Sequence, residues 1–444
     1  MDNINPRSII LDILIEINEN NKYSNVVLSD ALKKYQYLDH ADRAFISRCV
    51  MGLVERKITV DYIIDAVSKV KTARMKPVIR NILRMSVYQI MYMDNSKEYA
   101  ICNEAVKLAA KRGFFNLKGF VNGVLRNIIR QKNNILKDAG EDIIYSTPLW
   151  IVNMMQENYG SQKAEAILKA QFEDRPLSVR CNMALNTPDE LMEKLSGEGV
   201  TVKKSGIIDE ALFISGYDYL DKLKSFREGR FFVQDVSSML VAHIADPEKG
   251  SYVVDVCAAP GGKSLHMAEL VGDEGVVSSR DISDYKVSKI DENIAALGIK
   301  NIKTKVWDAT ITDKTVINKA DVVIADLPCS GLGILNKKPD IKYNASWEGC
   351  KQLAAIQRKI LACAADYVKC GGILMYSTCT LNREENVQNL KWFVDNYPFK
   401  QADISDRVPD LFRKESIKDG YVEILPGVDS GYCDGFFIAK LIRE

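Results

Sequence analysis

The segment that most constrains the fold of this chain is Asp255-Val-Cys-Ala-Ala-Pro-Gly-Gly-Lys263. It continues a mainly apolar run that begins at Tyr252 and predicts a buried strand, and the residues after it have the apolar spacing of a helix. Pro260 fixes one backbone φ angle, while Gly261 and Gly262 permit positive φ and a close approach of the backbone to a ligand. A strand, a glycine turn and a helix N-terminus together predict a nucleotide- or anion-binding corner at the carboxyl edge of a parallel sheet.

Two familiar nucleotide-binding motifs do not fit this corner. A Walker loop needs glycine at the position of Cys257, and the dinucleotide motif G-x-G-x-x-G is absent. An acid with the right spacing is present, because Asp281 ends an apolar run 20 residues after Gly261, where a ribose-binding carboxylate belongs. The alternative is a tight turn that binds no ligand.

From residue 252 onward, predicted strands alternate with predicted helices, which is typical of a doubly wound parallel α/β sheet. The expected strands are Tyr252–Val256, Gly275–Ser279, Ile302–Trp307, Val322–Ala325, Gly372–Met375 and Phe436–Leu441. The expected helices are Lys263–Val271, Tyr285–Leu297, Gln352–Val368 and Glu384–Asn396. Residues 399–433 are expected to be irregular.

Residues 1–138 predict an all-helical domain. Asn5-Pro6 is a helix start, Asp39 is a candidate helix cap, and further helices are expected at Pro77–Met91, Glu98–Lys111 and Lys118–Gln131. Six basic residues form the densest positive run, namely Lys69, Lys71, Arg74, Lys76, Arg80 and Arg84. Arg126 and Arg130 are four residues apart, so they share one helix face and are candidates for phosphate contacts.

The charge distribution separates this domain from the rest of the chain. Residues 1–140 contain 23 Lys/Arg and 14 Asp/Glu, whereas the remainder contains 37 and 45, although the whole chain has a net charge of only +1. A basic lobe joined to an acidic one favours a nucleic-acid partner. A solvated helical surface rich in lysine explains the same numbers equally well.

Between the two parts, residues 139–147 resemble a linker. Residues 150–171 predict one helix, and a small α/β subdomain follows with strands at Leu177–Asn182, Val200–Lys204, Ala211–Ser215 and Arg230–Val233 around a helix at Pro188–Leu195. Asp235 is expected to cap the helix Ser237–Ala245. The expected domains are therefore 1–138, 145–235 and 236–444.

The sequence predicts a cytosolic protein with reduced thiols. The first residues lack a basic region followed by an apolar core, so no signal peptide is expected, and no apolar run reaches the length of a membrane span. Ten cysteines without a C-x-x-C pair indicate free thiols, and the three histidines are not spaced as metal ligands, so no metal site is expected. The sequence does not give the oligomeric state, for which a monomer is the expectation.

Acids and thiols follow the predicted strands. Asp281, Asp308 and Asp326 come after the second, third and fourth strands, Cys329 follows Asp326 closely, and Cys379 comes after the fifth strand. Ligands of such sheets bind outside the carboxyl ends of the strands. A thiol at the edge of a nucleotide site can act as a nucleophile. The plainer alternatives are buried filler cysteines, the role expected of the other thiols outside the glycine segment, or a disulfide between Cys329 and Cys379.

Three motifs taken together, Asp255–Lys263, Asp326-Leu-Pro-Cys-Ser-Gly331 and Ser377-Thr-Cys379, resemble the S-adenosylmethionine-dependent RNA cytosine-5 methyltransferases. The helical domain resembles the NusB fold, which is fused to this catalytic module in the bacterial 16S ribosomal RNA cytosine-5 methyltransferase B (Sun/Fmu) family. The likeness covers essentially the whole chain and includes Glu384-Glu-Asn386 and Asp434-Gly-Phe-Phe437.

This resemblance implies a NusB-like bundle, a small α+β subdomain similar to an RNA-recognition motif, and a Rossmann-like class I methyltransferase domain. It assigns attack on carbon 6 of cytosine to Cys379, base binding to Asp326, and product release to Cys329. It implies that S-adenosylmethionine is held by Cys257, Ala258, Ala259, Pro260, Gly261, Gly262, Lys263, Asp281, Asp308 and Asp326, and that 16S ribosomal RNA is the partner. The basic side chains Lys338 and Lys342 are expected to extend the RNA surface near the pocket.

Three alternative functions remain open at this point. One alternative is the modification of transfer RNA or 23S ribosomal RNA, and another is a non-catalytic assembly factor that binds ribosomal RNA. A nucleotide-dependent hydrolase or dehydrogenase is disfavoured by the two missing motifs. Which cytosine is modified does not follow from the sequence.

Overall fold

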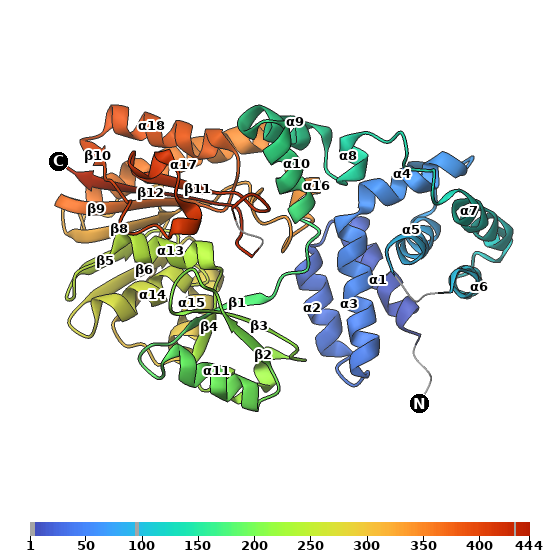
Figure 1. Cartoon of the computed structure of the whole chain (residues 1–444), viewed down its shortest axis with the longest axis horizontal. Helices are drawn as coiled ribbons and strands as arrows, with labels where there is room; N and C mark the ends of the chain where they lie inside the picture. Colours follow the sequence, from blue (N-terminus) through green and yellow to red (C-terminus); the bar gives the residue numbers. More distant parts are fainter. Residues whose placement is uncertain (1–4, 94–96, 430–431) are drawn as a thin grey trace. The chain divides into compact units, whose positions relative to one another are not determined.

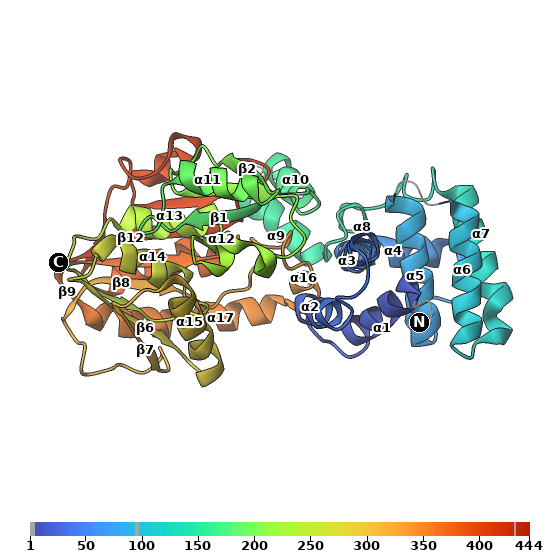
Figure 2. The same cartoon turned by 90° about the horizontal axis from the view of Figure 1, so that it is seen from below.

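A computed structural model describes residues 5–93, 97–429 and 432–444, shown in two views in Figures 1 and 2. The chain divides into two compact units: residues 1–157 with 335–344, and residues 158–334 with 345–444. The expected lack of a signal peptide concerns residues 1–4, which lie outside the described residues. The predicted domain limits at 138, 145 and 235 stay predictions.

The first unit is built mainly from helices. Its main helices are α1 (Pro6–Asn18), α2 (Ser24–Lys34), α3 (His40–Glu55), α4 (Lys57–Val67), α5 (Pro77–Tyr92), α6 (Glu98–Lys111) and α7 (Lys118–Gln131). The limits predicted for α6 and α7 are confirmed, and the side chain of Asp39 caps α3 by accepting a hydrogen bond from Asp42 N at 2.7 Å. Apolar faces of α1, α3, α4, α5, α6 and α7 meet in one core, in which Leu14, Ile46 and Leu83 are fully buried.

Residues 335–344 follow the Cys329 loop in the sequence but fold as part of the first unit. They contain the short helix α16 (Ile341–Asn344). Lys342 Nζ donates to the carbonyl of Glu55 at 2.7 Å, and Tyr343 Oη donates to the carbonyl of Val54 at 2.6 Å. These are carbonyls of the last turn of α3, which have no partner within the helix. Asp340 accepts a hydrogen bond from Ser24 N, where α2 begins.

The expectation that Lys342 extends a basic surface is therefore wrong. Its side chain is fully buried, and burial lowers the pKa of its ammonium group from 10.5 to about 7. The charge pattern of the sequence could not reveal this, because the burial depends on α3 from the other end of the chain. Lys338, in contrast, is exposed.

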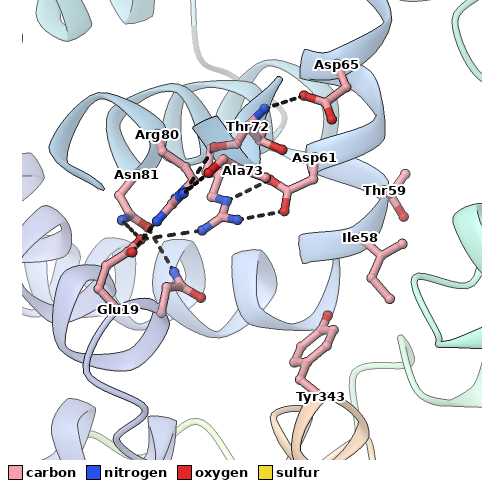
Figure 3. A network of polar contacts seen from close by, with 12 residues as sticks. Glu19, Ile58, Thr59, Asp61, Asp65, Thr72, Ala73, Arg80, Asn81 and Tyr343 are labelled. Atoms are coloured by element: carbon pink, nitrogen blue, oxygen red, sulfur yellow. Dashed lines mark hydrogen bonds and ion pairs between the residues drawn. The ribbon is translucent and has the colours of Figure 1, made fainter. Parts of the chain in front are cut away.

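Two arginines of the predicted basic run, the half-buried Arg80 and the buried Arg84, also belong to an ion-pair network, in which Figure 3 labels Arg80. Arg84 donates from Nε and Nη2 to the two carboxylate oxygens of Asp61, both at 2.7 Å. Arg80 pairs with Glu19, which also accepts from Asn81 Nδ2 at 2.8 Å. The carboxylates on α1 and α4 neutralise these arginines, so Arg80 and Arg84 are not free to bind phosphates.

The second unit begins within a helix pair and continues into a four-stranded antiparallel sheet. The prediction of one helix over 150–171 is wrong, since α9 (Leu149–Tyr159) and α10 (Ser161–Ala170) are separated at Gly160, whose φ is +77°. The sheet has the order β2-β3-β1-β4, with its strands at β1 (Leu177–Cys181), β2 (Thr201–Lys204), β3 (Ala211–Ser215) and β4 (Phe231–Val233). The short helices of this part are α11 (Pro188–Gly197) and α12 (Lys224–Arg227), whereas α8 (Glu141–Ile144), which lies in the expected linker, belongs to the first unit.

The main sheet contains eight strands among the described residues, in the order β10-β12-β9-β8-β5-β6-β7 with β11 beside β12. Strands β5 (Tyr252–Asp255), β6 (Val276–Asp281), β7 (Ile302–Val306), β8 (Ala320–Asp326) and β9 (Val368–Thr378) are parallel to one another. Strand β12 (Phe436–Arg443) runs antiparallel to β9. Residues 399–433 are not wholly irregular as expected, because β10 (Phe399–Gln401) and β11 (Tyr421–Ile424) both pair with β12.

Helices cover both faces of this sheet, as expected for a doubly wound fold. Neighbouring residues of a strand point to opposite faces of the sheet. On one face, Val253 packs with α13 (Val236–Ala245) and α14 (Gly262–Val271). On the other face, Val254 belongs to the core formed with α17 (Trp347–Tyr367) and α18 (Val387–Asn396). The remaining helix of the sheet region is α15 (Asp284–Leu297), and Asp235 caps α13 as predicted. In Figure 1, the labels β10, β12, β9, β8, β5 and β6 follow the strand order of the sheet from top to bottom.

Candidate functional site

The carboxyl ends of five parallel strands bring the predicted site residues to one edge of the main sheet. Segment 257–263 follows β5, Asp281 ends β6, and Asp308 lies just after β7. Asp326 ends β8, with Cys329 three residues later, and Cys379 follows β9 directly. Since β9, β8, β5, β6 and β7 are consecutive neighbours, the edge is one continuous row.

The glycine corner joins β5 to α14. Gly261 has a φ of +109°, which side-chain-bearing residues rarely adopt, and α14 begins at the next residue. A Cβ atom on Gly261 would lie 3.2 Å from Ile290 Cγ2, so tight packing also favours glycine here. Asp281 Oδ2 accepts a hydrogen bond from Ala259 N at 2.9 Å, which fixes the corner against the end of β6.

The acids along the edge differ in their surroundings. Asp281 also accepts from Ile282 N at 2.8 Å and lies 3.0 Å from Lys286 Nζ, so its carboxylate keeps an acceptor site for a further donor. Asp308 is half-buried and accepts from the backbone and hydroxyl of Thr310. Asp255, at the end of β5, is buried, and burial raises the pKa of its carboxyl to about 7. Carboxylates at adjacent strand ends suit the hydroxyl and amino groups of a nucleoside.

Lys263 connects the glycine corner to Asp326. Its Nζ atom lies 2.6 Å from Asp326 Oδ2 and 2.9 Å from Ser238 Oγ, and its side chain is largely buried. The second oxygen of Asp326 accepts from Ser377 Oγ at 2.8 Å. Sequence reasoning placed Lys263 in the cofactor loop and missed its partner, although a lysine in the first turn after β5 lies beside the end of the neighbouring strand β8.

The thiols of Cys329 and Cys379 lie 3.3 Å apart. Both are free thiols in the structure. The hydrogen bond to Cys379 and burial hold the pKa of the Cys329 thiol well above its usual range. The S–H group of Cys329 can therefore donate to Cys379 Sγ.

The loop that carries Cys329 and the loop that carries Cys379, called the two cysteine loops below, are joined directly through their backbones. Leu327 N donates to Ser377 O at 3.0 Å, and Gly333 N donates to Cys379 O at 3.0 Å. Gly435 N in turn donates to Gly333 O at 2.8 Å. A Cβ atom on Gly333 would collide with the carbonyl oxygen of Gly435 and would lie 2.8 Å from that of Cys379, so only glycine fits between the loops.

The described residues contain neither a cluster of metal ligands nor a membrane-spanning helix. No group of three or more His, Cys, Asp or Glu side chains there is arranged to hold a metal ion. In the same residues, no helix combines the length and apolar character needed to cross a bilayer.

Three known families match successive parts of the chain. Residues 4–130 match the NusB family, and residues 147–217 match the ferredoxin-like domain of RsmF/B-like methyltransferases. Residues 242–442 match the family described as 16S rRNA methyltransferase RsmB/F.

Individual proteins are similar as well, two of them over nearly the full length of this chain. A probable ribosomal RNA small subunit methyltransferase B from Bacillus subtilis is 35% identical over 99% of this chain and 98% of its own. The crystal structure of PH0851 has a TM-score of 0.84 at 25% identity and covers 99% of both chains. The structure of NSun6 from Pyrococcus horikoshii with SFG has a TM-score of 0.57 at 23% identity, covers 66% of this chain and 97% of its own, and supports the fold.

Proposed function

Because the chain belongs to the 16S rRNA methyltransferase RsmB/F family, we propose that it transfers a methyl group from S-adenosylmethionine to carbon 5 of a cytosine in 16S ribosomal RNA. The observation that carries this proposal is the pair of thiols 3.3 Å apart, beside a strand that ends in Asp326. Carbon 5 of cytosine is a weak nucleophile, and a covalent bond from a thiolate to carbon 6 activates it.

The cofactor-binding residues in this proposal are Cys257, Ala258, Ala259, Pro260, Gly261, Gly262, Lys263, Asp281, Asp308 and Asp326. The donor set fits a nucleoside, since carboxylates at the ends of β6 and β7 can accept hydrogen bonds from ribose hydroxyls and an adenine amino group. When bound, S-adenosylmethionine supplies an electrophilic methyl group on a sulfonium. The edge formed by β5 to β9 would hold it next to the thiols.

Cys379 is the nucleophile in this proposal. In this proposal, its sulfur accepts a hydrogen bond from the S–H group of Cys329, and this hydrogen bond stabilises the thiolate that attacks carbon 6. Asp326 holds the base at nitrogen 3 and the exocyclic amine, where it favours a protonated ring. Ser377 and Lys263 fix the carboxylate in that orientation. The cytosine must leave its stack to reach these groups.

Cys329 serves the release of the product. Once carbon 5 carries the methyl group, the thiol of Cys329 releases its own proton to solvent, and the resulting thiolate accepts the remaining proton of carbon 5. The electron pair of that C–H bond restores the double bond between carbons 5 and 6, and the pair of the C–S bond returns to Cys379. The two thiols thus form and break one covalent enzyme–RNA bond.

Replacement of each thiol tests this proposal. Cys379→Ala should abolish transfer of labelled methyl groups to 16S ribosomal RNA, whereas Cys329→Ala should accumulate a covalent protein–RNA adduct that survives denaturing gels. Cys370→Ala, at an exposed thiol, serves as the control and should behave as wild type. Near-normal turnover of Cys379→Ala would falsify the nucleophile assignment. Bisulfite sequencing of the product identifies the base and distinguishes carbon 5 from other positions.

The helical unit is the proposed source of phosphate contacts. Arg126 and Arg130 are both exposed on α7, four residues apart, and their guanidinium groups can reach successive phosphates. We likewise propose a cytoplasmic location, because ribosomal RNA is the substrate.

A further inference from the structure

Two consecutive buried residues each hold one of the two cysteine loops. Glu385 ends a short 3-10 turn (Arg383–Glu385), and Asn386 precedes α18. Both side chains are buried, and Glu385 is completely inaccessible to solvent.

Glu385 contacts the loop that carries Cys329. Its Oε2 atom accepts from Ser330 N at 2.8 Å, and its Oε1 atom accepts from Ser330 Oγ at 2.6 Å. Ser330 is the residue directly after Cys329. Two hydrogen bonds from one residue to both oxygens of a carboxylate fix the residue in orientation as well as distance.

Gln357 on α17 holds the other side of Cys329. Its Nε2 atom donates to Pro328 O at 2.9 Å and to Glu385 Oε2 at 3.1 Å. The peptide segment from Pro328 to Ser330 is thus held on both sides of the thiol. Tyr376 Oη donates to the carbonyl of Glu385, which ties this support to β9.

Asn386 contacts the loop that carries Cys379. Its Oδ1 atom accepts from Thr378 Oγ1 at 2.5 Å, and its Nδ2 atom donates to Thr380 O at 2.9 Å. Thr378 and Thr380 are the residues on either side of Cys379. Asn386 therefore holds the second thiol from both sides.

A hydroxyl pair links the two supports. Ser330 Oγ and Thr380 Oγ1 are 2.7 Å apart. Because the carboxylate of Glu385 can only accept, the single hydroxyl proton of Ser330 points to Glu385, and Thr380 must donate to Ser330. The direction of this chain, Thr380 to Ser330 to Glu385, depends on the carboxylate.

The partners of Glu385 indicate that its charge serves more than stability. Its hydrogen bonds in the described residues come from Ser330, Gln357 and Asn382, all of them neutral groups. Burial of a carboxylate without a cation costs free energy that hydrogen bonds offset only in part, and burial raises the pKa of Glu385 accordingly. A neutral side chain would fill the same space at a lower cost.

We propose that Glu385 and Asn386 are positioning residues, of which Glu385 sets the place of Cys329 and Asn386 sets the place of Cys379. This inference rests on the proposed two-thiol reaction and deepens it. The two residues then act in different halves of the reaction: Asn386 in the attack on carbon 6, and Glu385 in the removal of the carbon 5 proton and the release of Cys379.

The test compares Glu385→Gln with Asn386→Ala in the full chain. An amide nitrogen at position 385 cannot accept from Ser330 N, so the Cys329 loop loses its orientation. Glu385→Gln should keep single-turnover methylation within about threefold of wild type but lower steady-state turnover about 100-fold and accumulate the covalent adduct, as expected for a misplaced group. Asn386→Ala should lower single-turnover methylation and accumulate no adduct.

Glu384→Gln is the matched control, because it removes the same charge from the neighbouring residue. The side chain of Glu384 is half-buried. It should show wild-type kinetics. Calorimetry with S-adenosylmethionine should give the same affinity for all three variants. Should Glu385→Gln be insoluble, Ser330→Ala removes one of the two bonds and should accumulate adduct to a smaller extent.

Three outcomes overturn the inference. The first is that Glu385→Gln lowers the single- and multiple-turnover rates equally and forms no adduct. The second is that Glu385→Gln leaves both rates unchanged. The third is that Asn386→Ala accumulates adduct. Cys329→Ala is measured in parallel: absence of adduct in that variant refutes the two-thiol reaction itself, whereas adduct there and none in Glu385→Gln refutes only the role of Glu385.

Discussion

Lys263 Nζ lies 2.6 Å from Asp326 Oδ2, so an ion pair joins the glycine corner after β5 to the last residue of β8. The other oxygen of Asp326 is held by Ser377, two residues before Cys379. One carboxylate thus links the expected cofactor loop to the strand that precedes the proposed nucleophile. The arrangement orients Asp326 before any substrate is bound, which is the condition for electrostatic preorganisation.

Lys263→Met should therefore lower kcat/KM for methyl transfer. Loss of a hydrogen bond to a charged group costs about 2 kcal/mol, which corresponds to a decrease of about 30-fold. Steady-state methylation of 16S ribosomal RNA measures the effect, with Lys249→Met at an exposed position as the control. Equal rates in the two variants would show that Lys263 does not orient Asp326.

Gly333→Ala should separate the two cysteine loops. The added methyl group collides with the carbonyl of Gly435 and crowds that of Cys379, so the loops must move apart. We expect a loss of methylation of at least about 100-fold, with unchanged affinity for S-adenosylmethionine by calorimetry. Gly197→Ala, at a helical position with free space around it, should retain activity. Wild-type activity of Gly333→Ala would contradict the need for close loops.

Lys342 should make the stability of the helical unit depend on pH. Its pKa is about 7 in the folded chain and 10.5 in the unfolded one, so between these values the unfolded state binds more protons and stability rises with pH. The full change is on the order of 5 kcal/mol. Urea unfolding of the wild type and Lys342→Met, followed by circular dichroism from pH 7 to pH 10, measures the difference in slope. Lys338→Met is the exposed control, and identical slopes in all three proteins would exclude this titration.

Arg126 and Arg130 should contribute to RNA affinity through phosphates. Replacement of both by Gln should weaken binding to 16S ribosomal RNA and reduce the slope of log affinity against log salt concentration by about 2. Filter binding at several salt concentrations provides the measurement. The control replaces Lys319 and Lys369, exposed residues at the amino ends of β8 and β9, where the salt dependence should not change. An unaltered slope in the arginine variant would exclude these two contacts.

The sequence predicted the main sheet well because local patterns and sheet topology agree there. Strands β5, β6, β8 and β9 each carry a short apolar run, whereas β7 carries alternating lysines, and parallel connections place all five carboxyl ends on one edge. Spacing from Gly261 to Asp281 located the acid at the end of β6 without any structural information.

Other features depend on partners that are distant in sequence. Arg80 and Arg84 have the same local pattern as exposed basic residues, and only the carboxylates of Glu19 and Asp61 distinguish them. The supporting roles of Glu385 and Asn386 likewise need the loops at Ser330 and Thr380, which no periodicity brings together. Strands β10 and β11 are too short to be recognised before their pairing with β12 is known.

The insertion of residues 335–344 into the helical unit has a consequence for how the protein is made. Helices α1 to α7 leave the ribosome early, yet the carbonyls at the end of α3 receive Lys342 and Tyr343 only after about three quarters of the chain has been translated. The amino-terminal part can collapse early but reaches its final form late. Its completion marks the moment when the segment with Cys329, the first of the two proposed active-site cysteines, has also emerged.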